Sequence, residues 1–492
     1  MTHAREPSPS PVPPGGEPVT PGGQPVTPGG QPVLPALTLT ELARGIRDGS
    51  LSPVGLVTGA LASLHRWQPV TTAVSQVWPE EALDAARALP TSPHLPLAGI
   101  PVLVKENMDV AGHKSTACCD AFRDRRASDD AQVVASLRAA GAIVIGKANM
   151  HELAASATGD ISACGPMHNP WDPARLAGGS SGGSAAATAV RSVPLALGTD
   201  TAGSIRVPSS FCGVAGLKPT QGRLSMRGIM PLAPSLGCAG PVASCAEDLG
   251  VAFAVLADEP GSVARMREPA AGMLVARTPA GYFAEGIHPD VRRALASAAQ
   301  GLAAAGMRVT DVSLPGMQDA LGTWGDLAWP ELAESYPDLD LSRVGSHIAA
   351  HYHHGQGLPE ERQTRARAHG SEIRRSFLAA LRHADALLLP CTPYSAPRLS
   401  DAEIDVGGGQ TMNVFRGGPT WFTCPVNIAG LPAVALPAGF DANGMPLGIQ
   451  LVGRPGEEWT ILRIALALEA QMEPHEPPHE LTGERRAAWS GS

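Results

Sequence analysis

Short apolar runs alternate with helical patterns between residues 97 and 256. Apolar runs at Ile100–Val104 and Ala142–Ile145 predict strands, and the spacing over Ala131–Ala140 between them predicts a helix. A further alanine-rich helix is predicted from Ser184. Strands that alternate with helices are typical of a sheet layered with helices. We therefore predict an α/β fold.

A middle stretch, residues 258–385, contains predicted strands at Leu274–Ala276 and Arg308–Val312, a predicted helix at Val291–Ala305 and a long polar helical segment. The sheet pattern resumes after it, with strands at Ala386–Leu389, Ala433–Leu436 and Leu447–Val452 and a last helix around Ile461–Met472. Residues 441–444, Asp-Ala-Asn-Gly, have the composition of a hairpin turn. Because strands occur on both sides of the middle stretch, we predict a single large domain with an elaborated middle.

Both ends of the chain differ from this pattern. Residues 14–34 repeat a seven-residue Pro/Gly-rich unit three times, and so few apolar side chains predict a disordered tail over residues 1–35. Thr40 is the expected cap of the first helix, and Ser52-Pro53 the cap and first turn of the second. We assign residues 36–480 to the folded domain and 481–492 to a flexible C-terminus.

The composition of the chain limits the partners and the cellular location that we expect. The 492 residues carry 37 basic and 46 acidic side chains, a net charge of −9, which favours neither nucleic acid nor an acidic membrane as a partner. The chain has neither an apolar leader nor a membrane-length apolar run, so we expect it in the cytoplasm. Its eight cysteines form no CxxC pair and are expected to be reduced.

A glycine- and hydroxyl-rich segment precedes the alanine-rich helix. Residues 178–184 read Gly-Gly-Ser-Ser-Gly-Gly-Ser, a composition that lets backbone amides face a reacting group. Flexible linkers share it, but a linker in the middle of a domain is not expected. Two overlapping G-x-S-x-G matches centre on Ser180 and Ser181. A nucleophile elbow should follow a buried strand, whereas residues 172–177 have the composition of a loop.

A second hydroxyl-rich segment follows a predicted strand. The apolar run Val193–Leu197 ends in residues 198–206, Gly-Thr-Asp-Thr-Ala-Gly-Ser-Ile-Arg. Small residues after a strand can present Ser204 as a nucleophile together with several free amides, although a simple strand-to-loop turn has the same pattern. Serine needs a base, and Lys105 at the end of another apolar run is a candidate, with a solvated strand end as the alternative.

Taken together, these segments resemble the amidase signature family in order and spacing. The resemblance rests on residues 104–107, 178–184, 198–206 and 211–220, and extends through 146–150 and 427–433, so that it touches most of residues 36–475. It implies the family's fold, a mixed central β-sheet covered by helices on both faces.

Specific roles follow from the resemblance. It implies a Ser-cisSer-Lys triad of Ser204, Ser180 and Lys105, with a cis peptide bond at Ser180 and the pKa of Lys105 lowered toward 7 or 8 by burial. It further implies backbone amides that form an oxyanion hole, supplied by Thr201, Ala202, Gly203 and Ser204. The supporting residues that it implies are Ser181, which would orient Ser180 and Lys105, and an Asp200–Arg206 ion pair. No cofactor and no metal are expected.

Three functions compete. The first is a stand-alone amidase that releases ammonia or an amine from a small-molecule amide through an acyl-enzyme. The second is the glutamine-hydrolysing component of a tRNA-dependent amidotransferase, which belongs to the same family and needs partner subunits. Such components commonly have glutamine after the arginine of Gly-Ser-Ile-Arg, whereas this chain has Val207 at that position. The third is an inactive binding protein on the same scaffold. The stand-alone amidase is compatible with a homodimer.

The substrate itself is not identified by the sequence. Substrate choice is expected to depend on residues 317–375 and on the approach to Cys424, where the resemblance is weakest. The aromatic content of 4% argues against a pocket dominated by aromatic rings.

Two further motifs are weak. Residues 141–147 resemble the start of a Walker A loop, but Ala148 stands where a magnesium-binding hydroxyl is needed and the intervening residues favour a strand. His347 and His351 have the spacing of HExxH without its glutamate, so they are predicted to be surface or pocket-rim histidines, with His353 and His354 beside them.

Overall fold

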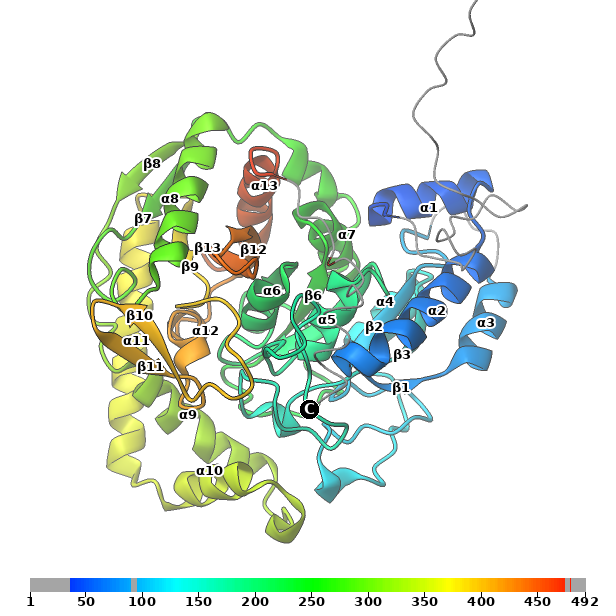
Figure 1. The fold of residues 1–492 in the computed structure, drawn as a ribbon, viewed down its shortest axis with the longest axis horizontal. Helices are drawn as coiled ribbons and strands as arrows, with labels where there is room; N and C mark the ends of the chain where they lie inside the picture. Colours follow the sequence, from blue (N-terminus) through cyan, green and yellow to red (C-terminus); the bar gives the residue numbers. More distant parts are fainter. Residues whose placement is uncertain (1–35, 90–94, 474–477, 479–492) are drawn as a thin grey trace, which may run out of the picture.

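A large mixed sheet forms the centre of the molecule (Figure 1). The computed structural model describes residues 36–89, 95–473 and 478. The sheet has 11 strands, in the spatial order β1 (Val74–Val77), β3 (Ile143–Ala148), β2 (Pro101–Lys105), β4 (Leu195–Asp200), β6 (Cys238–Ala243), β5 (Ala215–Lys218), β12 (Ala433–Phe440), β13 (Pro446–Val452), β9 (Ala386–Pro390), β7 (Leu274–Arg277) and β8 (Arg308–Asp311). Strands from both sides of the middle stretch share this sheet, so the prediction of one α/β domain is confirmed.

Strand direction explains where the sheet can hold a site. Strand β2 runs parallel to both β3 and β4, with Val104 opposite Leu197, so the carboxyl ends of these strands meet at one edge. Strands β12 and β13 pair in antiparallel fashion across the predicted turn, where the Asp441 carboxylate accepts hydrogen bonds from the backbone amides of Asn443 and Met445 at 2.8 Å each. A separate hairpin consists of β10 (Glu403–Gly407) and β11 (Gln410–Asn413).

Helices cover both faces of the sheet, as predicted. Alternate residues of β2 show this division, because Val102 and Val104 pack into one apolar cluster and Leu103 into another. The first face is covered by α1 (Leu39–Asp48), α4 (Gln132–Ala139), α7 (Ala246–Leu256), α8 (Pro289–Ala304) and α13 (Glu458–Glu469). The second is covered by α2 (Pro53–Thr71), α3 (Pro79–Ala88), α5 (Gly182–Ala189), α6 (Arg206–Cys212), α11 (Glu360–Leu381) and α12 (Cys424–Ile428).

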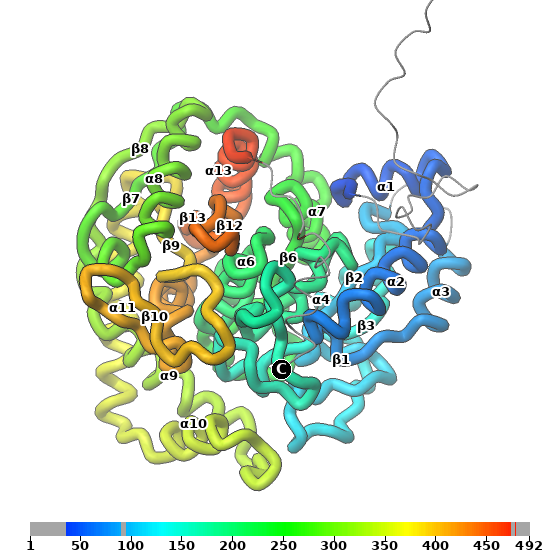
Figure 2. Tube along the Cα trace, in the orientation of Figure 1, coloured from blue at the N-terminus to red at the C-terminus, as the bar shows by residue number. Residues whose placement is uncertain are grey.

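Two helices of the middle stretch extend beyond the sheet. They are α9 (Ala320–Ser335) and α10 (Ser346–Gly357), and α10 lies at the lower edge of the molecule in Figure 2. Trp324, Trp329 and Ile348 on these helices form an apolar cluster with Ala202 and Cys424. The middle stretch therefore closes over the end of β4.

The first helix begins earlier than the sequence predicted. Thr38, rather than Thr40, is its N-cap: the Thr38 hydroxyl accepts a hydrogen bond from the Glu41 amide, and the Glu41 carboxylate accepts one from the Thr38 amide at 2.9 Å. This reciprocal arrangement needs a glutamate three residues after the cap, and from Thr40 that position is Ala43. Ser52 caps α2, with Pro53 in its first turn, as predicted.

Three further sequence predictions concern the ends of the chain, the cysteines and membrane-spanning segments. The predicted tail, residues 1–35, and the predicted C-terminal extension, 481–492, lie outside the described residues. All eight cysteines are free thiols. In the ranges that the structure describes, no helix has the length and apolar character to span a membrane.

Candidate active site

Lys105 lies at the carboxyl end of β2 and is completely buried. Its Nζ lies 2.7 Å from Ser180 Oγ and 2.8 Å from Thr199 Oγ1. The parallel pairing of β2 with β4 puts Lys105 beside the end of β4, which carries Thr199. The fold therefore brings together two of the three residues predicted to do chemistry, Lys105 and Ser180.

Burial changes the charge of Lys105. Desolvation lowers the pKa of its ammonium group to about 7, although the negative charge of Asp200 acts in the opposite direction. A lysine with this pKa is neutral in a large fraction of molecules at neutral pH, and a neutral amine can accept a proton.

Ser180 lies in the glycine-rich segment before α5. The peptide bond between Gly179 and Ser180 is cis. The backbone carbonyl of Ser180 accepts a hydrogen bond from the amide of His151 at 3.1 Å, which ties the segment to the residues that follow β3. A side chain at Gly183 would collide with the backbone of Ala73, so this close packing requires glycine.

Ser204 follows β4 and is 5% exposed. Its backbone carbonyl accepts a hydrogen bond from the amide of Ser181 at 3.1 Å, so the two serine-rich segments are in contact. Within the described residues, no hydrogen bond joins the Ser204 hydroxyl to Ser180. Ser204 instead lines a cavity of about 280 Å³.

The four residues predicted to form an oxyanion hole have backbone carbonyls that accept hydrogen bonds and backbone amides that donate none to the described residues. Thr201 O accepts from Trp324 Nε1 at 2.8 Å, and Ala202 O from Thr423 Oγ1 at 2.5 Å. Gly203 O accepts from the amide of Val207 at 2.7 Å. None of the amides of residues 201–204 donates a hydrogen bond to another described residue. Four unpaired donors in one buried segment can bind an anion, because buried amides are otherwise almost always paired.

Ser181 is hydrogen-bonded to Thr199 and not directly to Lys105. Its hydroxyl donates to the carbonyl of Thr199 at 3.1 Å and accepts from the Thr199 amide at 3.3 Å, and it forms no hydrogen bond with Lys105 or with the Ser180 side chain. Thr199, which sequence reasoning did not single out, supplies the second hydroxyl that contacts Lys105, after that of Ser180. Its position two residues after the apolar run of β4 was the available signal.

The Asp200–Arg206 ion pair is fully buried. Arg206 Nε lies 3.0 Å from Asp200 Oδ2, and both side chains have 0% exposure. The guanidinium also donates to Gln450 at 2.8 Å and Asn427 at 2.5 Å, which ties β4 to β13 and α12. Desolvation alone would raise the pKa of Asp200, but the charge and hydrogen bonds of Arg206 outweigh it and lower the pKa to about 2.

We expect Asp200→Asn to destabilise the protein by about 3 to 5 kcal/mol, because it leaves the Arg206 charge buried without its partner. Denaturant unfolding measures this loss. The matched control is Asp311→Asn, since the Arg277–Asp311 pair has a similar 2.8 Å separation but is 45% and 54% exposed, and its loss should cost less than about 1 kcal/mol. Equal losses in the two variants would contradict the structural role of Asp200.

The same pair predicts a pH dependence of stability. The folded-state pKa of Asp200 lies at about 2, below its ordinary value of 3.8, so the stabilisation is present above about pH 4. It is lost as the pH falls toward 2. Acid unfolding of the wild type should therefore be steeper between pH 4 and 2 than that of Asp200→Asn.

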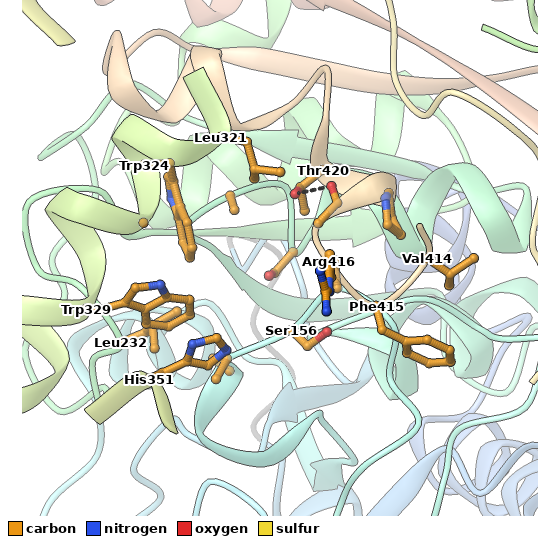
Figure 3. A pocket seen from close by; sticks show the side chains of 18 residues that line it. Ser156, Leu232, Leu321, Trp324, Trp329, His351, Val414, Phe415, Arg416 and Thr420 are labelled. Carbon is orange, nitrogen blue, oxygen red and sulfur yellow. Dashed lines mark hydrogen bonds between the residues drawn. The ribbon is translucent and has the colours of Figure 1, made fainter. Parts of the chain in front are cut away.

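The cavity beside Ser204 has Trp324, Trp329 and His351 on one side, and Ser156, Arg416 and Phe415 on the other, in the view of Figure 3. Trp324 and Trp329 form a T-shaped pair with centroids 5.1 Å apart, and the ring of His351 stacks on Trp329 at 3.8 Å. Ser156 and Arg416 lie across from these rings in the view of Figure 3. Trp324, Trp329 and Phe415 are the aromatic members among the 18 lining residues, so rings contribute to the pocket but do not dominate it.

Part of the cavity wall comes from the regions predicted to choose the substrate. Trp324, Trp329 and His351 belong to residues 317–375, and residues 414–420 lead toward Cys424. His351 is thus a pocket histidine, as predicted. The other weak motif is structural: Lys147 lies within β3, where its buried Nζ donates to the carbonyl of Lys114 at 2.7 Å.

The fold and the site define a layered α/β enzyme that has a buried lysine against a serine hydroxyl and a mainly apolar pocket nearby. The family model named Amidase matches residues 56–462, and the chain belongs to that family. It is a hydrolase that acts on carbon–nitrogen amide bonds.

Known proteins are similar over nearly the whole chain. The A subunit of the glutamyl-tRNA(Gln) amidotransferase from Symbiobacterium thermophilum is 34% identical over 91% of this chain and 99% of its own length. A crystal structure of an amidase superimposes with a TM-score of 0.83, at 32% identity over 89% of this chain and all of that one. The corresponding amidotransferase component of Thermotoga maritima superimposes with a TM-score of 0.78, at 27% identity over 92% of this chain and all of that one.

Proposed function

We propose that the protein is an amidase in which Ser204 attacks the amide carbonyl, Ser180 relays its proton and Lys105 is the base. The observation that carries the proposal is the contact of 2.7 Å between Lys105 Nζ and Ser180 Oγ, made by a lysine whose pKa burial lowers to about 7. Neutral lysine can then take a proton through Ser180, so no histidine is needed.

The proposed reaction has two steps. As the Ser204 oxygen bonds to the carbonyl carbon, its proton passes to Ser180 while the Ser180 proton passes to Lys105. The oxyanion is bound by the unpaired amides of residues 201–204. The protonated relay then gives a proton to the leaving nitrogen, the carbon–nitrogen bond breaks, and ammonia or an amine departs. Water attacks the acyl-enzyme with the same groups acting as base, and the acid is released.

Ser204 and Ser180 need to come within hydrogen-bond distance for this relay. Their segments already touch through the Ser181 amide and the Ser204 carbonyl. Hydrogen bonds between catalytic groups are often long before substrate binds and tighten in the complex. Rotation about one side-chain bond of serine is enough to redirect its hydroxyl.

A second candidate is glutamine hydrolysis as one component of a tRNA-dependent amidotransferase. The relatives favour it, because a glutamyl-tRNA(Gln) amidotransferase component matches 91% of this chain. In that case the protein would work with partner subunits. The pocket favours the first candidate, since none of the described residues that line it carries a carboxylate to bind the ammonium group of glutamine.

Ammonia release by the purified chain separates the two candidates. We expect the protein alone to hydrolyse members of a panel of aliphatic, aryl and carboxylate-bearing amides, with L-glutamine included. Activity on glutamine only, and only after partner subunits are added, would contradict the stand-alone amidase and support the second candidate. A panel with no activity under either condition would remove both.

A further inference from the structure

One charged side chain stands out in the cavity beside Ser204. Among the 18 lining residues, Arg416 is the only arginine or lysine, and there is no aspartate or glutamate. The only other titratable lining residue is His351, whose pKa burial lowers to about 4, so that its ring is neutral at pH 7. The cavity therefore presents a single positive charge to its contents.

The Arg416 guanidinium is also without a partner in the part of the chain that the structure describes. Its backbone amide donates to Asn413 Oδ1 at 2.9 Å, which fixes the loop. The Arg416 side chain is exposed to solvent at the opening of the cavity and forms no ion pair or hydrogen bond with the described residues. The neighbouring cavity, of about 500 Å³, is lined by Arg416 and Glu285, yet these two side chains form no ion pair. Arginine presents several donors in a planar arrangement that matches a carboxylate.

Ser156 lines the same side of the cavity as Arg416 and belongs to a hydrogen-bonded group. The hydroxyl groups of Ser156 and Thr158 are 2.8 Å apart, and Thr158 donates to Asp160 at 2.5 Å. Figure 3 shows Ser156 and Arg416 on the side opposite the rings of Trp324 and Trp329. A ligand that fits both sides has a flat or apolar body against the rings and an acidic group beside Arg416.

We propose that the substrate is an amide that bears a carboxylate and no ammonium group, with the carboxylate bound by Arg416. The inference rests on the proposed function and names its substrate class. Arg416 selects the anion, and the absence of an acidic lining residue disfavours a zwitterion such as glutamine. The aromatic rings accommodate a flat carbon skeleton between carboxylate and amide.

Matched amides test the proposal. Glutaramate and pentanamide differ only in a terminal carboxylate, and L-glutamine adds an ammonium group to glutaramate; 4-carbamoylbenzoate and benzamide form a rigid aromatic pair. We expect kcat/KM from ammonia release to be about 10-fold or more higher for the anion in at least one pair, and higher for glutaramate than for glutamine. A preference for glutamine over glutaramate, or no carboxylate advantage in either pair, overturns the proposal.

Substitutions connect this preference to the residue. Arg416→Gln should lower the anion-to-neutral ratio of kcat/KM by about 10-fold, and Arg416→Lys should retain part of it, since lysine keeps the charge but loses the planar geometry. Arg308→Gln, at an exposed arginine on the edge strand β8, is the control and should leave the ratio unchanged. An unchanged ratio in Arg416→Gln overturns the assignment.

Binding without turnover separates this proposal from the proposed function. Calorimetric titration of Ser204→Ala with each anion and its neutral partner measures the preference whether or not the triad is correct. Tighter binding of the anion, lost in the Ser204→Ala, Arg416→Gln double variant, supports Arg416 even if ammonia release fails. Equal binding, or no binding of either anion, overturns the inference even if the enzyme is an active amidase.

Discussion

Replacement of Ser204 by alanine is expected to lower kcat for amide hydrolysis by about 10⁴-fold or more. The variant lacks the oxygen that would form the acyl-enzyme, and neither Ser180 nor Ser181 lines the cavity that Ser204 lines. The free amides of residues 201–204 remain in place, so substrate binding should persist. The loss should therefore appear in kcat far more than in KM.

The measurement is single-turnover and steady-state ammonia release with an amide that the wild type hydrolyses. Ser371→Ala is the matched control, because Ser371 is an exposed serine on α11 whose hydroxyl donates only to the carbonyl of Arg367. It should retain wild-type rates. A Ser204→Ala variant that is folded by circular dichroism and retains a rate within tenfold of the wild type would remove Ser204 from the mechanism.

Replacement of Lys105 by alanine is expected to lower kcat/KM by about 10³-fold at pH 7, the scale of a lost general base. In the wild type the base form gains population as the pH rises through the Lys105 pKa of about 7, so the rate should rise below that pH and level off above it. In Lys105→Ala this midpoint should disappear. The residual rate should continue to rise at higher pH as hydroxide replaces the lysine.

Two variants separate this role from a structural one. Lys105→Arg keeps a cation that does not deprotonate, so it should stay inactive across the same pH range. Lys147 is also buried, and its pKa is lowered to about 8, but its Nζ donates to the carbonyl of Lys114 and to Ser115. Lys147→Met, when folded, should keep the midpoint near 7. A midpoint near 7 that survives in Lys105→Ala would show that another group is the base.

Much of the fold could be predicted because apolar spacing is a local property. The run at Ile100–Val104 became β2 with a shift of one residue, and strands on both sides of the middle stretch joined one sheet. The error at the first helix was also local: Thr38 and Thr40 are both good caps, and the reciprocal bond with Glu41 decided between them. Such choices between nearby residues depend on side-chain geometry that a periodicity does not contain.

The candidate site was predicted in part. The resemblance to the amidase signature family, carried by motif order and spacing, singled out Lys105, Ser180 and Ser204 as candidates, and the structure places Lys105 against Ser180. The sequence did not indicate that Thr199 is the second contact of Lys105, because that contact depends on the register between β2 and β4. The orientation of Ser181 toward Thr199 depends on the same register.

The amino-acid sequence alone establishes which groups are present: serine-rich and glycine-rich segments, a lysine at a strand end, and an α/β pattern that buries the strands. What those groups can do depends on how the folded chain packs around them. Complete burial lowers the pKa of Lys105, and folding gathers Trp324, Ser204 and Arg416 around one cavity although they lie far apart in the chain. Desolvation and the convergence of distant segments are properties of the packed molecule, and no local pattern encodes them.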